Sequence, residues 1–167
     1  MGDLPHAANL RWGRHSEPGA AYHITKCRDN RSSLSLTDAA AAESIVASID
    51  WHRRNRHAHL LAFVVMPDHV HWVFVLGEVR ALDTVMEGFG SVTWQGFRRV
   101  YGPKVGKVWE DEYHDHRLRS EERVWGTLEY VHENPVRKGL CGKAEDWPWS
   151  TANARFRNWI EEEYLGR

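Results

Sequence analysis

The feature that most constrains the fold of this chain is a pair of apolar segments separated by only two residues. Residues 59–66 and 69–76 are rich in valine, leucine and phenylalanine, and Pro67-Asp68 stands between them. Proline fixes φ and aspartate favours turns, so this pattern predicts a tight antiparallel β-hairpin. Any fold proposed for the chain has to contain these two strands side by side.

The segments around the hairpin complete an alternating pattern. Further strands are predicted at 21–27 and 112–119, the second of them charged and at the edge of the sheet. Helices are predicted at 38–53, 81–101 and 120–134. The third helix should end near Asn134, because a proline at 135 disfavours the α conformation of the residue before it. The order strand, helix, hairpin, helix, strand, helix predicts an α+β fold with helices packed on an antiparallel sheet.

Length and composition predict one domain. The 167 residues carry a net charge of −1, and the longest apolar run, Leu60 to Met66, is too short to cross a membrane. Two cysteines make no disulfide framework, and no signal peptide precedes the first strand, so we expect a soluble protein of the cytoplasm. We expect residues 1–20 to be a loosely held arm, 21–150 to be the functional domain and 151–167 to be a tail or helix.

The second strand of the hairpin begins with a histidine pair. Side chains alternate across a strand, so His69 and His71 share one face and can together bind a divalent cation. The spacing alone is weak evidence, since chance placement of 11 histidines gives roughly 0.7 such pairs in a chain of this length. A pair of half-buried structural histidines is the alternative. For the other two pairs, His57/His59 and His114/His116, solvated positions are the preferred interpretation.

The third helix carries a tyrosine at the border of its apolar stripe. At about 100° per residue, Tyr130 projects roughly 130° from the centre of the stripe formed by Val124, Leu128 and Val131. Asn134 follows one turn later on the same side. A structural tyrosine at an interface is the alternative, because such tyrosines are common.

The two groups of residues together suggest phosphodiester chemistry. A tyrosine hydroxyl can act as a nucleophile, and a divalent metal can polarise the phosphoryl oxygen. With His69, His71 and Asn134 as metal ligands, attack by Tyr130 would give a 5′-phosphotyrosine and a free 3′-OH. The reverse step onto another 3′-OH would be strand transfer without ATP.

Basic residues supply candidate DNA contacts, since such side chains bind phosphates. The arginine excess suits a nucleic-acid partner but also fits a GC-rich genome, and the near-neutral net charge argues against non-specific coating of DNA. The aromatic residues among those at 88–108 have the spacing of a core face. The candidates are Arg53 and Arg54 in a basic cluster, Arg98 and Arg99 on the second helix, and Arg137 and Lys138 beside the tyrosine.

Three segments in order resemble a known family. MPDHVHWVF (66–74), VWEDEYHDHRLRSEE (108–122) and YVHENPVRKGL (130–140) are similar to the REP-associated tyrosine transposases. These are a branch of the IS200-like single-tyrosine transposases in the HUH endonuclease superfamily. YHIT (22–25) and DWPWS (146–150) match too, so the resemblance covers residues 22–150. Asp68 and Lys138 depart from it, where the family often has Asn and Ala.

The resemblance implies a fold and an activity. The fold would be a ferredoxin-like antiparallel sheet with the histidine pair on a central strand. The activity would be cleavage and joining of single-stranded DNA at palindromic hairpin elements, dependent on Mg²⁺ or Mn²⁺. Tyr130 would be the nucleophile, and His69, His71 and Asn134 the metal ligands.

Two other functions stay open at this stage. The first is a catalytically silent, domesticated protein that binds DNA hairpins, and the second is an unrelated histidine-rich metal-binding protein. For the leading hypothesis, the expected partner is single-stranded or hairpin DNA. The expected location is the nucleoid of a prokaryote and not a membrane. The chain could act as a monomer or a homodimer.

Overall fold

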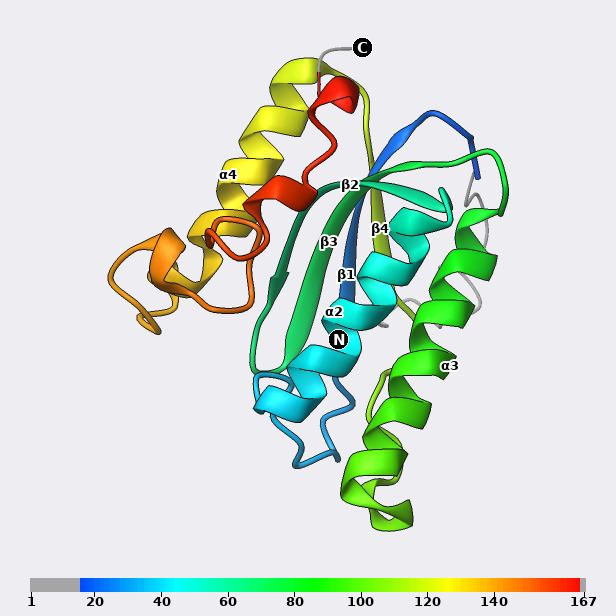
Figure 1. Cartoon of the computed structure of the whole chain (residues 1–167), viewed down its shortest axis with the longest axis vertical. Helices are drawn as coiled ribbons and strands as arrows, with labels where there is room; N and C mark the ends of the chain where they lie inside the picture. Colours follow the sequence, from blue (N-terminus) through cyan, green and yellow to red (C-terminus); the bar gives the residue numbers. More distant parts are fainter. Residues whose placement is uncertain (1–15, 166–167) are drawn as a thin grey trace, which may run out of the picture.

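Four strands form one antiparallel sheet in the order β2-β3-β1-β4 (Figure 1). The computed structural model describes residues 16–165, so most of the arm expected at 1–20 lies outside the described residues. The strands are β1 (Ala21–Cys27), β2 (Ala58–Val65), β3 (His69–Leu76) and β4 (His114–Leu118). The predicted hairpin is β2–β3, and β3 lies inside the sheet, which confirms the α+β prediction with the histidine pair on a central strand.

Three long helices cover the two faces of this sheet, and short 3-10 turns complete the chain. The helices are α2 (Ala39–Arg54), α3 (Leu82–Tyr101) and α4 (Glu121–Arg137). In Figure 1, α2 and α3 lie on one side of the strands and α4 on the other. Both predicted helix caps are present, since the side chains of Asp38 and Ser120 accept hydrogen bonds from backbone amides of α2 and α4.

Strand alternation divides the core into two layers. On β3, Trp72 and Phe74 join the larger apolar cluster, which includes residues of α2 and α3. Val73 faces the opposite way and joins a smaller cluster that includes Leu128 and Val131 of α4. His69 and His71 share the parity of Val73, so they belong to the face that carries α4.

The end of α4 corrects one prediction. The helix does not stop near Asn134 but continues through Pro135 to Arg137. A proline this close to a helix end removes only one intrahelical hydrogen bond. The last turn is closed instead by bonds from the amides of Gly139 and Leu140 to the carbonyls of Val136 and Pro135.

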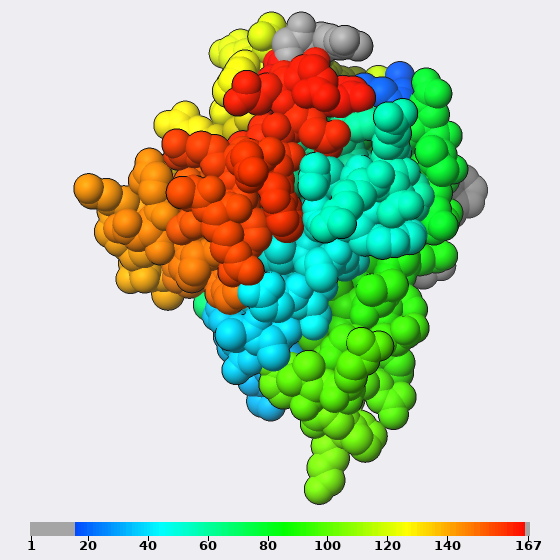
Figure 2. Space-filling model, viewed as in Figure 1, coloured from blue at the N-terminus to red at the C-terminus, as the bar shows by residue number. Residues whose placement is uncertain are grey.

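The C-terminal segment packs on the domain as irregular chain with two 3-10 turns, Arg157–Trp159 and Glu162–Tyr164. Figure 2 shows this orange and red segment beside the cyan helix α2, and Arg155 forms an ion pair with Glu43 across that contact. The carboxylate of Glu161 accepts a hydrogen bond from the backbone amide of Leu60 at 2.7 Å. Within residues 16–165, no helix is long and apolar enough to cross a membrane.

Candidate active site

The two histidines of β3 turn the same ring nitrogen toward each other. The Nε2 atoms of His69 and His71 are 3.2 Å apart. On the other side of the His69 ring, Nδ1 lies 2.7 Å from Oδ1 of Asp68. A carboxylate only accepts, so it holds the ring proton on Nδ1 and leaves the Nε2 lone pair free. Asp68, which stands where the resembled family often has Asn, thus fixes the orientation of the His69 ring.

Two residues of β1 contact Nδ1 of His71 and fix the orientation of its ring. Its Nδ1 lies 3.0 Å from Nε2 of His23 and 3.1 Å from Oγ1 of Thr25. Burial lowers the pKa of His71 to about 3, with further lowering by His69 and His23, so its ring is neutral near pH 7. Burial likewise lowers the pKa of His23 to about 4. Neither β1 residue was singled out from the sequence, although both lie in the YHIT segment.

Asn134 reaches the histidines from α4. Its side chain is only 3% exposed, and its Nδ2 lies 3.1 Å from Nε2 of His71. Its Oδ1 is buried with no hydrogen-bond partner among the described residues. The two ends of an amide can exchange by a half-turn, which would direct Oδ1 to the point that the two Nε2 atoms face.

This set of atoms fits a divalent cation. Two imidazoles bound to one ion at about 2.1 Å have nitrogens roughly 3 Å apart, close to the 3.2 Å seen between His69 and His71. The orphaned oxygen of Asn134 supplies a third donor. No cluster of three His, Cys, Asp or Glu side chains suited to a metal occurs within residues 16–165. The amide is therefore the group that would complete the pair.

Tyr130 stands beside these groups and is open to solvent. Its side chain is 46% exposed, and its ring centroid lies 5.7 Å from that of His71. The guanidinium of Arg137 lies 4.2 Å from the ring centroid and donates to the backbone carbonyl of Tyr130 at 2.8 Å. Its exposure is that of a residue at the border of the apolar stripe, as predicted. The cation–π contact with Arg137 holds its ring.

The other candidate DNA contacts are divided between the two faces. Arg137 and Lys138 lie at the end of α4, near Tyr130 and His69 respectively. Arg53 and Arg54, on α2, both bind the carboxylate of Asp50, at 2.8 and 2.6 Å. On α3, Arg98 lies over the Trp94 ring and Arg99 is exposed. The arginines of α2 and α3 are therefore remote from the histidine pair.

The two other histidine pairs differ from each other. His114 and His116 are exposed on β4, as predicted. For His57 the prediction of a solvated position is wrong, because the residue is buried with its Nδ1 3.2 Å from Nδ1 of His52. His59 is half-buried against Glu161 and Tyr164. The sequence pattern does not reveal these contacts. His57 meets His52 across the turn that follows α2, and His59 meets residues near the end of the chain.

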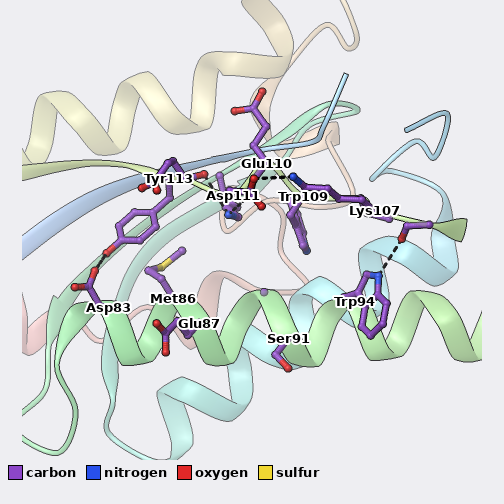
Figure 3. Close-up of a pocket in the computed structure, with 15 residues that line it drawn as sticks. Asp83, Met86, Glu87, Ser91, Trp94, Lys107, Trp109, Glu110, Asp111 and Tyr113 are labelled. Atoms are coloured by element: carbon purple, nitrogen blue, oxygen red, sulfur yellow. Dashed lines mark hydrogen bonds and ion pairs between the residues drawn. The ribbon is translucent and has the colours of Figure 1, made fainter. Parts of the chain in front are cut away.

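A further cavity lies away from the histidine pair and Tyr130 (Figure 3). It measures about 630 Å³ and lies between α3 and residues 106–113, on the α2/α3 face of the sheet. None of the predicted site residues lines it. Figure 3 shows Met86 and Glu87 from α3 facing Trp109 and Tyr113. Five carboxylates line this cavity, those of Asp83, Glu87, Glu110, Asp111 and Glu112.

Comparison with known proteins agrees with this architecture. The family described as "Transposase IS200 like" matches residues 17–134, so the chain belongs to the IS200-like transposase family. The REP-associated tyrosine transposase of Escherichia coli (strain K12) is 24% identical over 135 residues, 80% of this chain and 76% of its own length. A relative from Haemophilus influenzae is 24% identical over 117 residues, 64% of this chain and 65% of its own length.

A solved structure shares the fold. It is described as a REP-associated tyrosine transposase bound to a REP hairpin, with a TM-score of 0.67 and 24% sequence identity. The match covers 83% of this chain and 79% of that one. The resemblance noted in the three sequence segments is thereby confirmed, and the ferredoxin-like sheet is common to both proteins.

Proposed function

We propose that this chain is a metal-dependent single-stranded DNA endonuclease and strand transferase that acts on hairpin-forming elements. The observation that carries the proposal is the meeting of His69, His71 and Asn134 beside the exposed Tyr130. Membership of the transposase family supports the reaction class. The solved relative bound to a REP hairpin supports hairpin DNA as the partner.

The metal ligands are Nε2 of His69, Nε2 of His71 and the side-chain oxygen of Asn134. The ion would be Mg²⁺ or Mn²⁺, and when bound it polarises a phosphoryl oxygen of the substrate. Asp68 keeps the ring proton of His69 on Nδ1, and His23 with Thr25, accepting from Nδ1 of His71, would do the same for the second ring. The protein thus holds both donor nitrogens ready for the ion.

Tyr130 is the nucleophile in this proposal. Its phenolic oxygen forms a bond to phosphorus while the bond from phosphorus to the 3′-oxygen breaks. The phenol loses its proton to solvent, and the leaving 3′-oxygen takes up a proton. The products are a 5′-phosphotyrosine and a free 3′-OH, and the reverse reaction onto another 3′-OH joins strands.

The remaining assignments follow from this function. Residues 21–150 would form the transposase domain, between the arm at 1–20 and the C-terminal segment at 151–167. Arg137 and Lys138 are the DNA contacts nearest to Tyr130. The protein would act in the cytoplasm of a prokaryote, at the nucleoid, as a monomer or a homodimer.

The test is a denaturing gel with labelled hairpin DNA from repeats that flank the gene, in Mg²⁺ or Mn²⁺. Wild type should give a cleaved strand and a covalent protein–DNA band. Tyr130→Phe and His69→Ala should give neither, whereas Tyr164→Phe, which alters a tyrosine stacked on His59, should behave as wild type. Cleavage by Tyr130→Phe would show that another nucleophile acts. Binding without cleavage in every metal would favour the catalytically silent hairpin-binding protein.

A further inference from the structure

A second cavity, about 470 Å³ in volume, opens directly beside Tyr130. It lies between α4 and the strands β1 and β4, on the same face of the sheet as the histidine pair. Its walls include Tyr130, His71 and His23 from the candidate active site. They also include His116 of β4 and Arg123, Gly126 and Thr127 of α4, which the proposed reaction does not yet use.

Three polar side chains of this cavity, on β4 and α4, have no hydrogen-bond partner among the described residues. The guanidinium of Arg123, the hydroxyl of Thr127 and the ring of His116 form no side-chain hydrogen bond or ion pair in the part of the chain that the structure describes. No carboxylate lines the cavity. A group of free donors without a competing anion suits a phosphate oxygen.

The contrast with the larger cavity strengthens this argument. Five carboxylates and only two lysines, Lys26 and Lys107, line the 630 Å³ cavity of Figure 3, so its excess of negative charge disfavours a phosphodiester. The smaller one combines a permanent cation, Arg123, with the side chains of Thr127 and His116. Of these two cavities, the one next to the candidate nucleophile is therefore the one suited to the DNA backbone.

Gly126 keeps one wall of this cavity open. It lies inside α4, one turn before Tyr130, where glycine weakens a helix. A Cβ added there would meet no heavy atom within 4 Å. Packing inside the protein does not require glycine at this position. A larger side chain would instead reduce the space next to the tyrosine.

We propose that this cavity is the subsite for a nucleotide adjoining the scissile phosphodiester, in a single-stranded segment of the substrate. Arg123, His116 and Thr127 bind its phosphate, and the absent side chain at Gly126 leaves room for it. A cavity of this size admits one small group and not a duplex. The proposal rests on the proposed function, which it extends by naming residues that bind the strand.

The experiment measures fluorescence anisotropy of hairpins with a short 5′ or 3′ single-stranded tail, and of the same hairpin without a tail, in EDTA. Arg123→Gln should weaken binding of one tailed hairpin about tenfold. The slope of the logarithm of its binding constant against the logarithm of salt concentration should become shallower by about 0.7, the value for one lost phosphate contact on a single strand. Binding of the tail-less hairpin should not change.

Gly126→Leu separates the subsite from helix stability. The variant should melt at a higher temperature than wild type yet bind the tailed hairpin about tenfold more weakly. Gly90→Leu is the matched control, because Gly90 also lies inside a helix with no heavy atom within 4 Å of an added Cβ, but outside this cavity. Tailed-hairpin affinity that is unchanged in both Arg123→Gln and Gly126→Leu would overturn the subsite.

The two proposals fail in different ways. If wild type forms the covalent band and both variants bind tails normally, the subsite is wrong and the function stands. If wild type never forms the band but the two variants lose tail binding, the function is wrong and the strand-binding cavity stands.

Discussion

At the scale of single residues, the polar atoms around His71 are arranged as a divalent cation would require. The Nε2 atoms of His69 and His71 face each other across 3.2 Å, while the opposite nitrogens of the two rings contact Asp68, His23 and Thr25. Asn134 adds a buried oxygen with no hydrogen-bond partner in residues 16–165. Buried polar atoms are normally satisfied, and the proposed metal site would give this oxygen a partner.

Asn134 therefore provides a direct test of the metal site. Asn134→Ala should weaken Mn²⁺ binding about tenfold, because the third donor is lost. Asn134→Asp should bind at least as tightly as wild type, because a carboxylate presents an oxygen in either orientation. Isothermal titration calorimetry measures both. Equal Mn²⁺ affinity in wild type and Asn134→Ala, with both proteins folded by circular dichroism, would remove Asn134 from the ligand set.

At the scale of elements, the NPVRKGL segment has a structural role as well as a chemical one. Gly139 has φ +70°, a left-handed conformation that lets its own amide and that of Leu140 close the last turn of α4. The same helix carries Tyr130 and Asn134. Closing this end correctly therefore helps to hold the proposed nucleophile and the amide in place.

Gly139→Ala should lower the free energy of unfolding by about 1 kcal/mol, because an L-residue is strained at this φ. Urea denaturation followed by circular dichroism measures the loss. Gly142→Ala is the control, since Gly142 has neither a left-handed φ nor a heavy atom within 4 Å of an added Cβ. A loss of the same size in both variants would show that the left-handed conformation is not the cause.

The junction of α2 and β2 contains a second histidine contact, and it makes stability depend on pH. Burial lowers the pKa of His52 to about 4, and His57 and Arg80 lower it further. The unfolded chain binds this proton near pH 6.5, whereas the folded chain excludes it. The associated stability is therefore complete above about pH 6.5 and is lost as pH falls toward 4.

His52→Gln should flatten this acid dependence. Between pH 6 and 4.5, the slope of the unfolding free energy against pH should fall by up to about 1.4 kcal/mol per unit relative to wild type. Urea titrations at several pH values give the slope. His114→Gln, at an exposed position of β4, is the control and should keep the wild-type slope. A slope unchanged in His52→Gln would mean that His52 is protonated in the folded protein.

At the scale of the whole molecule, the sheet separates the face of the proposed active site from a structural one. The histidine pair, Tyr130 and the proposed strand-binding cavity lie on the α4 side. The arginines of α2 lie on the other side, where both bind the single carboxylate of Asp50. Under the proposed function, the local charge near α4 therefore matters more for DNA binding than the net charge of −1.

Paired variants test this division. Arg137→Ala with Lys138→Ala should weaken hairpin binding at least tenfold, because both cations lie next to the site. Arg53→Ala with Arg54→Ala should change it less than twofold, since Asp50 already binds both guanidinium groups. Electrophoretic mobility shifts at fixed salt compare the two. The opposite order of effects would place the hairpin on the α2 face.

The sequence by itself determined the parts of this protein that follow from local periodicity. Alternation along residues 69–76 put His69 and His71 on one face, and helical spacing put Tyr130 at the border of its stripe and Asn134 beside it. The tertiary structure alone decided what meets across elements. Cross-strand register brings His23 and Thr25 to His71, and packing of α4 brings Asn134 to His71 and His116 to the cavity beside Tyr130. Such contacts join residues far apart in the chain, and sequence periodicity carries no information about which of them will touch.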